Sequence, residues 1–172
     1  MAVAVSGPIV LIGAGNMGGA MLGGWLKSGV KGGDVLVIDP GPPPAMAKFI
    51  ADNGVSHATS VPEGVKAGVV FLAIKPQIMD AVLPPLKGIV GPETVIVSVA
   101  AGKTLRSIES HLGEAATVRA MPNTPAMIGR GVTGAYANAR VTEAQRALVH
   151  DLLRVRGQID WVETEADIDA VT

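Results

Sequence analysis

Apolar residues in this chain gather into short runs, which alternate with longer stretches where polar and apolar residues are mixed. The first four runs are almost entirely Val, Ile and Leu, which is typical of strands buried on both faces of a parallel sheet. Shorter runs follow in the second half of the chain. In chain order the runs predict strands over residues 9–12, 35–38, 69–74, 95–99, 117–120, 132–136 and 159–162.

Five stretches between these runs are predicted to be helical, and they cover residues 16–27, 44–52, 77–83, 104–111 and 142–154. Pro44 suits the first turn of its helix, where a missing N–H breaks no hydrogen bond. Helices that alternate with strands indicate βαβ crossovers. The sequence therefore predicts an α/β fold, a doubly wound and mostly parallel sheet with helices on both faces.

The first predicted strand runs directly into Gly-Ala-Gly-Asn-Met-Gly at residues 13–18, a G-x-G-x-x-G motif. In dinucleotide-binding folds the first glycine permits a tight turn, the second lets the backbone approach a pyrophosphate, and the third lets the helix pack on the sheet. The helix N-terminus then directs free N–H groups toward the phosphates. In a chain with 22 glycines the alternative is a glycine-rich structural turn, but the strand before and the helix after favour a Rossmann-like dinucleotide site.

Composition narrows the classes of partner. The length of 172 residues suits one ordinary domain, and a formal net charge of −1 gives no electrostatic footprint for nucleic acid or an acidic membrane. The absence of cysteine excludes a disulfide framework and thiolate chemistry, and it fits the cytoplasm, where we expect the protein. His57, His111 and His150 lack the paired spacing of metal ligands, so no metal site is expected.

Residues 1–26 carry no charged side chain, which raises the alternative of a membrane span or a signal peptide. Seven glycines and Pro8 interrupt this stretch, and no basic segment precedes it. A buried parallel strand followed by a glycine-rich helix explains the same apolar composition. We therefore expect no membrane association.

Asp39 follows the second predicted strand, about where dinucleotide-binding folds place an acidic residue against the ribose hydroxyls. A carboxylate there also repels a 2′-phosphate, so Asp39 favours NADH over NADPH. The alternative is a turn-forming Asp in front of Pro40.

Two further strand ends carry candidate contacts, since ligands of open α/β sheets lie at the carboxyl ends of the strands. Pro76 stiffens one exit, and the ammonium of Lys75 is a compact donor for phosphate or ribose oxygens. The alternative for Lys75 is a surface lysine at a helix start. The small residues at 98–102 leave clearance for a flat ring such as nicotinamide, and their alternative is a plain turn before Thr104.

Another strand end leads into Met-Pro-Asn-Thr-Pro at residues 121–125, where two prolines fix an irregular loop. Asn123 and Thr124 can both orient an amide or a carboxylate, and a rigid polar loop at a sheet edge is typical of a site. Arg119 precedes this loop and could pair with a carboxylate. We expect instead that it forms a structural ion pair.

Taken together, four segments resemble the pyrroline-5-carboxylate reductase family, and the resemblance runs through the whole chain. The segments are Ile-Gly-Ala-Gly-Asn-Met-Gly at 12–18, Ala-Ile-Lys-Pro-Gln at 73–77, Ser-Val-Ala-Ala-Gly at 98–102 and Met-Pro-Asn-Thr-Pro at 121–125. Many dehydrogenases share the first, whereas the last is much more specific. The resemblance implies an oxidoreductase that reduces 1-pyrroline-5-carboxylate to L-proline by hydride transfer from NAD(P)H, the last step of proline biosynthesis.

The resemblance also implies the site residues. Cofactor contacts are expected from Ile12, Gly13, Ala14, Gly15, Asn16, Met17, Gly18, Ala73, Ile74, Lys75, Pro76 and Ala101. Asn123 and Thr124 are expected near the nicotinamide, although no residue is assigned to catalysis. A cyclic imine is readily protonated, so its carbon accepts hydride without a strong base, and the site needs to supply orientation, clearance and a hydrogen-bond donor near the nitrogen.

The chain departs from the family in two respects. Members that prefer NADPH often carry Ser, Thr or Arg where this chain has Asp39-Pro40, so we expect relaxed specificity or a preference for NADH. The chain also stops where the family's helical dimerisation domain begins, after Asp-Ile-Asp-Ala-Val-Thr at 167–172. We expect an NAD(P)-binding domain over 1–164, the start of that second domain at 165–172, a helix capped by Thr164, and a fragment that binds dinucleotide but reduces the imine poorly. The full-length protein is expected to be a homo-oligomer.

Rival functions stay open at this point. Another imine or β-hydroxyacid dehydrogenase shares the glycine motif, usually with a catalytic Lys or Asp in a helical second domain. A non-catalytic Rossmann module that senses NAD(P) would bind cofactor without turnover. A purely structural α/β domain would not explain the glycine turn together with Asp39.

Overall fold

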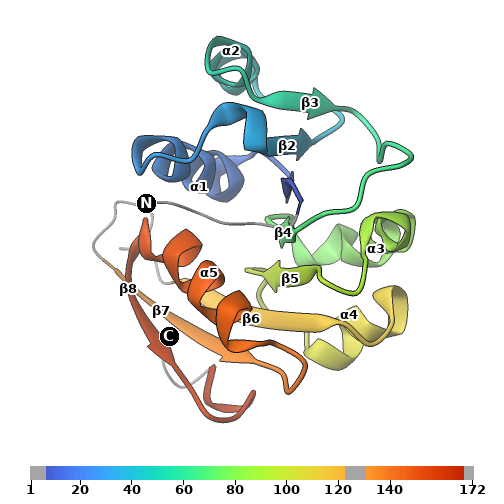
Figure 1. The fold of residues 1–172 in the computed structure, drawn as a ribbon, viewed down its shortest axis with the longest axis vertical. Coiled ribbons are helices and arrows are strands. Elements are labelled where there is room, and N and C mark those ends of the chain that lie inside the picture. Colours follow the sequence, from blue (N-terminus) through green and yellow to red (C-terminus); the bar gives the residue numbers. More distant parts are fainter. Residues whose placement is uncertain (1–6, 123–130, 169–172) are drawn as a thin grey trace.

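The computed structural model describes residues 7–122 and 131–168, whose strands form one sheet between two layers of helices (Figure 1). The strand order is β3-β2-β1-β4-β5-β6-β7-β8. Strands β1 to β6 run parallel, β7 runs antiparallel to β6, and β8 runs parallel to β7. The bounds are β1 Ile9–Ile12, β2 Val35–Ile38, β3 Ser56–Ala58, β4 Val69–Leu72, β5 Val95–Ser98, β6 Ala116–Pro122, β7 Gly131–Ala137 and β8 Gly157–Trp161. The predicted α/β class with a doubly wound, mostly parallel sheet is confirmed.

Seven of these strands were predicted, and β1 and β2 have the predicted bounds. Strand β3 was missed because Ser56–Ala58 is short, mostly polar and mostly exposed, so it forms no apolar run. Strands β4 and β5 end before the predicted residue, whereas β6 continues to Pro122 because β7 pairs with it beyond the level of the parallel strands.

The five predicted helices are present as α1 Asn16–Lys27, α2 Pro44–Asp52, α3 Met79–Leu86, α4 Leu105–Leu112 and α5 Glu143–Arg154. The predicted first residues of the last two, Thr104 and Thr142, are their N-caps, and each side-chain oxygen accepts a backbone N–H of the first turn. Single-turn 3-10 segments occupy Gly32–Asp34, Pro76–Ile78 and Lys87–Ile89. Helix α3 therefore begins later than predicted, and it continues through Pro84 and Pro85 to the buried Leu86.

Each face of the sheet has its own apolar core. Helices α1, α2 and α5 cover one face, where Leu11, Val37 and Phe71 are buried. Helices α3 and α4 cover the other, where Ile12, Leu72 and Ile96 are buried. The near-continuous apolar runs of the parallel strands thus fill both cores, as their pattern indicated. Across residues 7–122 and 131–168, no helix has the length and apolar character that a membrane span requires.

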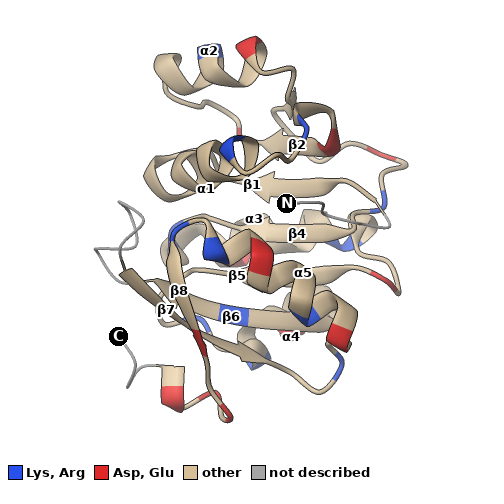
Figure 2. Cartoon of the chain, turned by 60° about the vertical axis from the view of Figure 1, so that its left-hand side comes forward, with Lys and Arg blue, Asp and Glu red and all other residues tan. Residues whose placement is uncertain are grey.

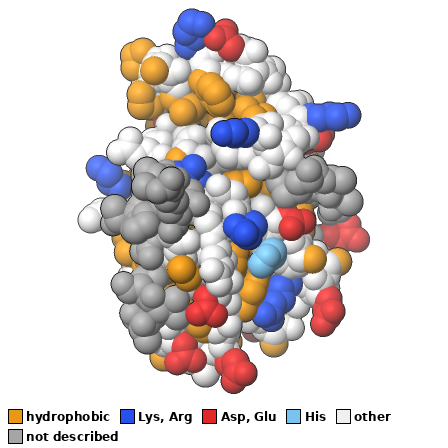
Figure 3. All heavy atoms as spheres, turned by 90° about the vertical axis from the view of Figure 1, so that its left-hand side faces the viewer, with side chains coloured by type: hydrophobic (Ala, Val, Ile, Leu, Met, Phe, Trp, Pro, Cys, Tyr) orange, Lys and Arg blue, Asp and Glu red, His pale blue; other side chains and the backbone are white. Residues whose placement is uncertain are grey.

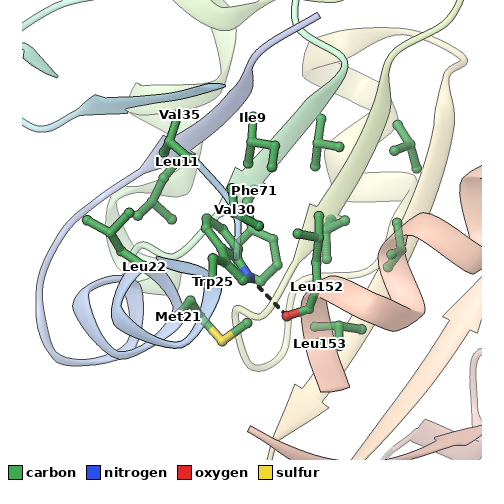
Figure 4. Close-up of a cluster of buried hydrophobic side chains, with 14 of the residues drawn as sticks. Ile9, Leu11, Met21, Leu22, Trp25, Val30, Val35, Phe71, Leu152 and Leu153 are labelled. Atoms are coloured by element: carbon green, nitrogen blue, oxygen red, sulfur yellow. Dashed lines mark hydrogen bonds between the residues drawn. The ribbon is translucent and has the colours of Figure 1, made fainter. Parts of the chain in front are cut away.

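Trp25 joins the first helix to the last (Figure 4). Its side chain is fully buried, and its ring meets Phe71 edge to face at a centroid distance of 5.1 Å. Its Nε1–H donates to the carbonyl oxygen of Leu152 at 2.9 Å. A buried indole needs such a partner, because an unpaired N–H in the core is costly. Trp25 therefore holds α5 against α1 on the face of the sheet where Phe71 of β4 is buried.

The chain beyond β8 folds back onto the sheet. The N–H of Asp167 donates to the carbonyl of Thr164 at 3.1 Å, and that of Ile168 donates to the carbonyl of Glu165 at 3.2 Å. Ile168 is fully buried. These turns begin where the Thr164-capped helix was expected, and residues 169–172 lie outside the described residues.

Asp80 links the two helices of the second face. Its Oδ1 lies 3.0 Å from Nε2 of His111, in the last turn of α4, and 3.7 Å from Nζ of Lys103. The hydrogen bond from His111, followed by the charge of Lys103, holds the pKa of Asp80 below its usual value. The link therefore stabilises the fold at pH values above the usual carboxyl pKa, and the contribution is lost as pH falls through the lowered pKa.

Substituting Trp25→Phe is expected to lower the free energy of unfolding by about 1–3 kcal/mol, because it leaves the buried carbonyl of Leu152 without its donor. The matched control is Trp161→Phe, since Trp161 is half-buried and donates to Nδ1 of His150 near the surface. Its effect is expected to stay within about 1 kcal/mol. Chemical denaturation measures both variants, and equal losses would contradict the role of Trp25.

Asp80→Asn is expected to destabilise the protein at pH 7 and to lose that effect as pH falls below about 4, since both proteins then lack the carboxylate. Unfolding measured from acid to neutral pH checks this. In a His111→Phe background the destabilisation caused by Asp80→Asn should shrink, because the first cause of the pKa shift is gone. A destabilisation that stays constant with pH would refute the assignment.

Candidate functional site

The glycine loop follows β1 at the carboxyl edge of the sheet, and two of its glycines are required by the chain's own backbone. Gly13 has φ +92°, and a Cβ there would lie 2.6 Å from the carbonyl oxygen of Ala73. A Cβ on Gly18 would lie 2.0 Å from the carbonyl oxygen of Gly13. A side chain at Gly13 would force the loop away from the residue that follows β4, and one at Gly18 would force α1 away from the loop.

Gly15 differs from both. It is exposed, and a Cβ at this position would meet no protein atom within 4 Å. Gly15 is also the N-cap of α1, which has no side-chain cap and no acidic residue in its first turn. A 12-residue helix therefore presents uncompensated N–H groups and its positive dipole end beside open space. This is the cradle that a pyrophosphate fits and that a Cβ would fill.

Asp39 lies beside this loop, at the end of β2. Its Oδ2 accepts from the N–H of Ala14 at 2.8 Å, and its Oδ1 accepts from the N–H of Gly41 at 2.8 Å. Nε2 of His57 lies 2.9 Å from the Asp39 carbonyl oxygen. The carboxylate thus forms the turn that was the alternative interpretation and also braces the glycine loop. Each oxygen keeps a further acceptor position, so ribose hydroxyls remain compatible with this geometry.

Strand register brings the predicted segments to one edge. Ile12 of β1 pairs in register with Ile38 of β2 and with Leu72 of β4, and Leu72 pairs in turn with Ser98 of β5. The next residue in each strand therefore emerges at the same level. Backbone bonds continue there from Ala73 to Ile12 at 2.9 Å and from Val99 to Leu72 at 3.2 Å. β1 and β4 are also where the strand order reverses, the usual place for a ligand in such sheets.

The structure places all the predicted cofactor residues that it describes along this edge. Ile74 packs close to Gly13, where an added Cβ would lie 3.0 Å from its Cγ2. Lys75 and Ala101 are exposed. Asn123 and Thr124 lie outside the described residues.

Arg119 forms the structural ion pair that was expected, with a partner that was not. Its side chain is only 7% exposed, and its Nη1 lies 2.9 Å from Oε2 of Glu165. Arg119 is the single charged residue of β6, and Figure 2 shows one blue segment on that strand. The signal for Glu165 in the sequence was only that of an acidic residue in a helix first turn, because its partner is 46 residues away.

Two cavities lie away from this edge. One of about 780 Å³ is lined by residues that include Thr94, Ala116 and Arg140, near the starts of β5 and β6. The other, of about 410 Å³, lies between α5 and β8, where Arg146 stands 4.4 Å above the ring of Trp161. Neither cavity includes a residue of the glycine loop. On the face seen in Figure 3, basic and acidic side chains lie interspersed, and hydrophobic ones gather near the top.

Comparison with known proteins agrees with this geometry. A family model described as "NADP oxidoreductase coenzyme F420-dependent" matches residues 8–102, from the start of β1 to the loop after β5. The chain is 42% identical over 166 residues to the pyrroline-5-carboxylate reductase of Pseudomonas aeruginosa, covering 95% of this chain and 60% of that protein. It is 38% identical over 157 residues to that of Escherichia coli, covering 90% and 58%.

Among solved structures, a pyrroline-5-carboxylate reductase from Coxiella burnetii superposes with a TM-score of 0.86 at 33% identity, covering 95% of this chain and 62% of that one. The chain thus spans about 60% of the length of the curated relatives it matches. The resemblance inferred from the four motifs is confirmed. The chain belongs to the family described as "NADP oxidoreductase coenzyme F420-dependent".

Proposed function

We propose that this chain binds NADH or NADPH at the carboxyl edge of its sheet, as the cofactor-binding part of a reductase that converts 1-pyrroline-5-carboxylate to L-proline. The observation that carries the proposal is the open space at Gly15 beside the uncapped N-terminus of α1. The names of the relatives from Pseudomonas aeruginosa and Escherichia coli support the substrate.

Each part of the dinucleotide has residues that suit it. The N–H groups at the start of α1 suit the pyrophosphate, and Asp39 beside Ala14 suits the adenosine ribose. The exposed Lys75 offers a cation at the same edge. The loop at 99–102 offers backbone and small side chains for the flat nicotinamide ring, with Asn123 and Thr124 proposed nearby.

On this proposal the reaction requires the cofactor and the imine to be oriented, more than it requires a side chain that transfers a proton. When bound, the reduced nicotinamide supplies the hydride. The residues of this chain then have to hold the ring at a fixed depth and exclude water from the carbon that accepts the hydride. A protonated cyclic imine is already electrophilic, which is why small and backbone groups at 99–102 suffice on this side.

We extend the proposal to the organisation of the protein. Residues 1–164 form the cofactor-binding domain, and residues 165–172 begin the helical dimerisation domain that the family resemblance implies. On this proposal the enzyme that contains this domain is a cytoplasmic homo-oligomer, and residues 1–172 alone, which span about 60% of the relatives' length, reduce the imine poorly. A turnover assay with 1-pyrroline-5-carboxylate, run on the chain and on a full-length relative, tests this. Comparable turnover would refute it.

Gly15→Ala is expected to weaken NADH binding by about tenfold or more without loss of folding, because the new methyl group enters the space proposed for the pyrophosphate. The matched control is Gly23→Ala in the same helix, where an added Cβ also meets no atom within 4 Å. The control should keep its affinity and gain about 0.5–1 kcal/mol of stability. Fluorescence titration measures both, and unchanged binding in Gly15→Ala would overturn the proposal.

The carboxylate of Asp39 is expected to make the chain bind NADH at least as well as NADPH. Asp39→Ser should shift the ratio of the two affinities toward NADPH by about tenfold, because it removes the charge facing the 2′-phosphate. The matched control is Asp34→Ser, an exposed residue before β2. Tenfold tighter binding of NADPH by the unmodified chain would reduce Asp39 to a structural brace.

A further inference from the structure

Arg119 is a cation in the interior of the sheet. It lies in β6 opposite Ser98 of β5, in the same register row as Ile12 and Leu72, which face α3 and α4. Both Arg119 and Ser98 are buried. A buried guanidinium is tolerated only when a partner compensates its charge, so the position of Arg119 depends on the carboxylate that reaches it.

The carboxylate is that of Glu165, and one of its oxygens binds both β6 and α4. Oε2 of Glu165 accepts from Nη1 of Arg119 at 2.9 Å and from the backbone N–H of Leu105 at 2.8 Å. Leu105 is the first residue of α4, and its N–H is one of the donors that the helix itself cannot satisfy. The N-cap Thr104 accepts from Ser107 instead, so Glu165 completes the cap and adds negative charge where the helix dipole favours it.

The residues held by Glu165 border the place proposed for the nicotinamide. The loop from Val99 to Thr104 leaves β5 at the carboxyl edge and ends at Leu105. Its first end is fixed by the bond from Val99 to Leu72 and by the contact of 3.3 Å between the Ala100 N–H and Oγ of Ser98. Glu165 fixes its other end. Through Arg119 it also holds β6, three residues before that strand ends at Pro122.

We propose that Glu165 is a positioning residue for the nicotinamide half of the dinucleotide site. It does not touch the cofactor. It fixes the separation between the 99–104 loop and the end of β6, and therefore the space that the nicotinamide ring would enter between them. This inference rests on the proposed function, because it assumes a dinucleotide bound along the carboxyl edge.

The adenosine half of the site is built separately, from the glycine loop and Asp39. A ligand with only that half, ADP-ribose, should therefore be indifferent to Glu165, whereas NADH should depend on it. The ratio of the two dissociation constants isolates positioning from a general loss of structure, since a merely structural role changes both alike.

The test compares Glu165→Gln, Arg119→Lys, Arg119→Met and the unmodified chain by titration with NADH and with ADP-ribose. Glu165→Gln keeps an oxygen for the Leu105 N–H but loses the charge that faces Arg119. We expect it to weaken NADH about tenfold, to leave ADP-ribose within about twofold, and to reduce the fluorescence enhancement of the bound nicotinamide. Arg119→Lys keeps the ion pair and should retain most of the NADH affinity, whereas Arg119→Met loses the ion pair and should lose that affinity. The matched control is Glu163→Gln, an exposed glutamate two residues away, which should bind both ligands normally.

Four outcomes would overturn the inference. Unchanged binding of NADH by Glu165→Gln would remove any positioning role. Parallel losses for NADH and ADP-ribose, or loss of the folded signal in thermal melting, would show that Glu165 acts on the whole domain. An unmodified chain that binds neither ligand would overturn the proposed function itself, and the inference with it.

Discussion

The close approach of β1 to β4 beyond their last paired residues is the constraint on which the rest of this structure depends. The backbone of Gly13 passes so near the carbonyl of Ala73 that no Cβ fits between them, and the start of α1 passes equally near Gly13. These contacts bring the first helix onto the sheet at the point where the strand order reverses. Because the helix begins there, its unsatisfied N–H groups face the space between the two halves of the sheet.

The same constraint separates two kinds of glycine within one motif. Gly13 and Gly18 are required by the packing of the chain against itself, so a sequence that merely had to fold would keep them. Nothing in the described chain requires a glycine at position 15. The absence of a side chain there leaves space only for a molecule that binds from outside. The three glycines of the motif thus differ in role: two are structural, and the third indicates a ligand.

Sequence patterns predicted the parallel core well, because strands such as β1 and β2 are buried on both faces and consist of unbroken apolar runs. They failed for β3, whose pairing with β2 depends on position at the sheet edge and not on side-chain character. At the site, local patterns predicted the glycine loop and Asp39. They could not predict that Asp39 accepts from Ala14 or that Glu165 reaches Arg119, since these contacts depend on which strands become neighbours.

The hydrogen bond from Trp25 to Leu152 spans 127 positions of the chain. Helix α1, which follows the glycine loop, is made early in synthesis, yet the buried N–H of Trp25 meets its acceptor only after α5 has been made. Contacts this distant in sequence delay folding, because the intervening chain must be ordered before they form. The first helix therefore completes its packing only once α5 has been made, and a nascent chain that stops before α5 exposes the apolar face on which Trp25 lies.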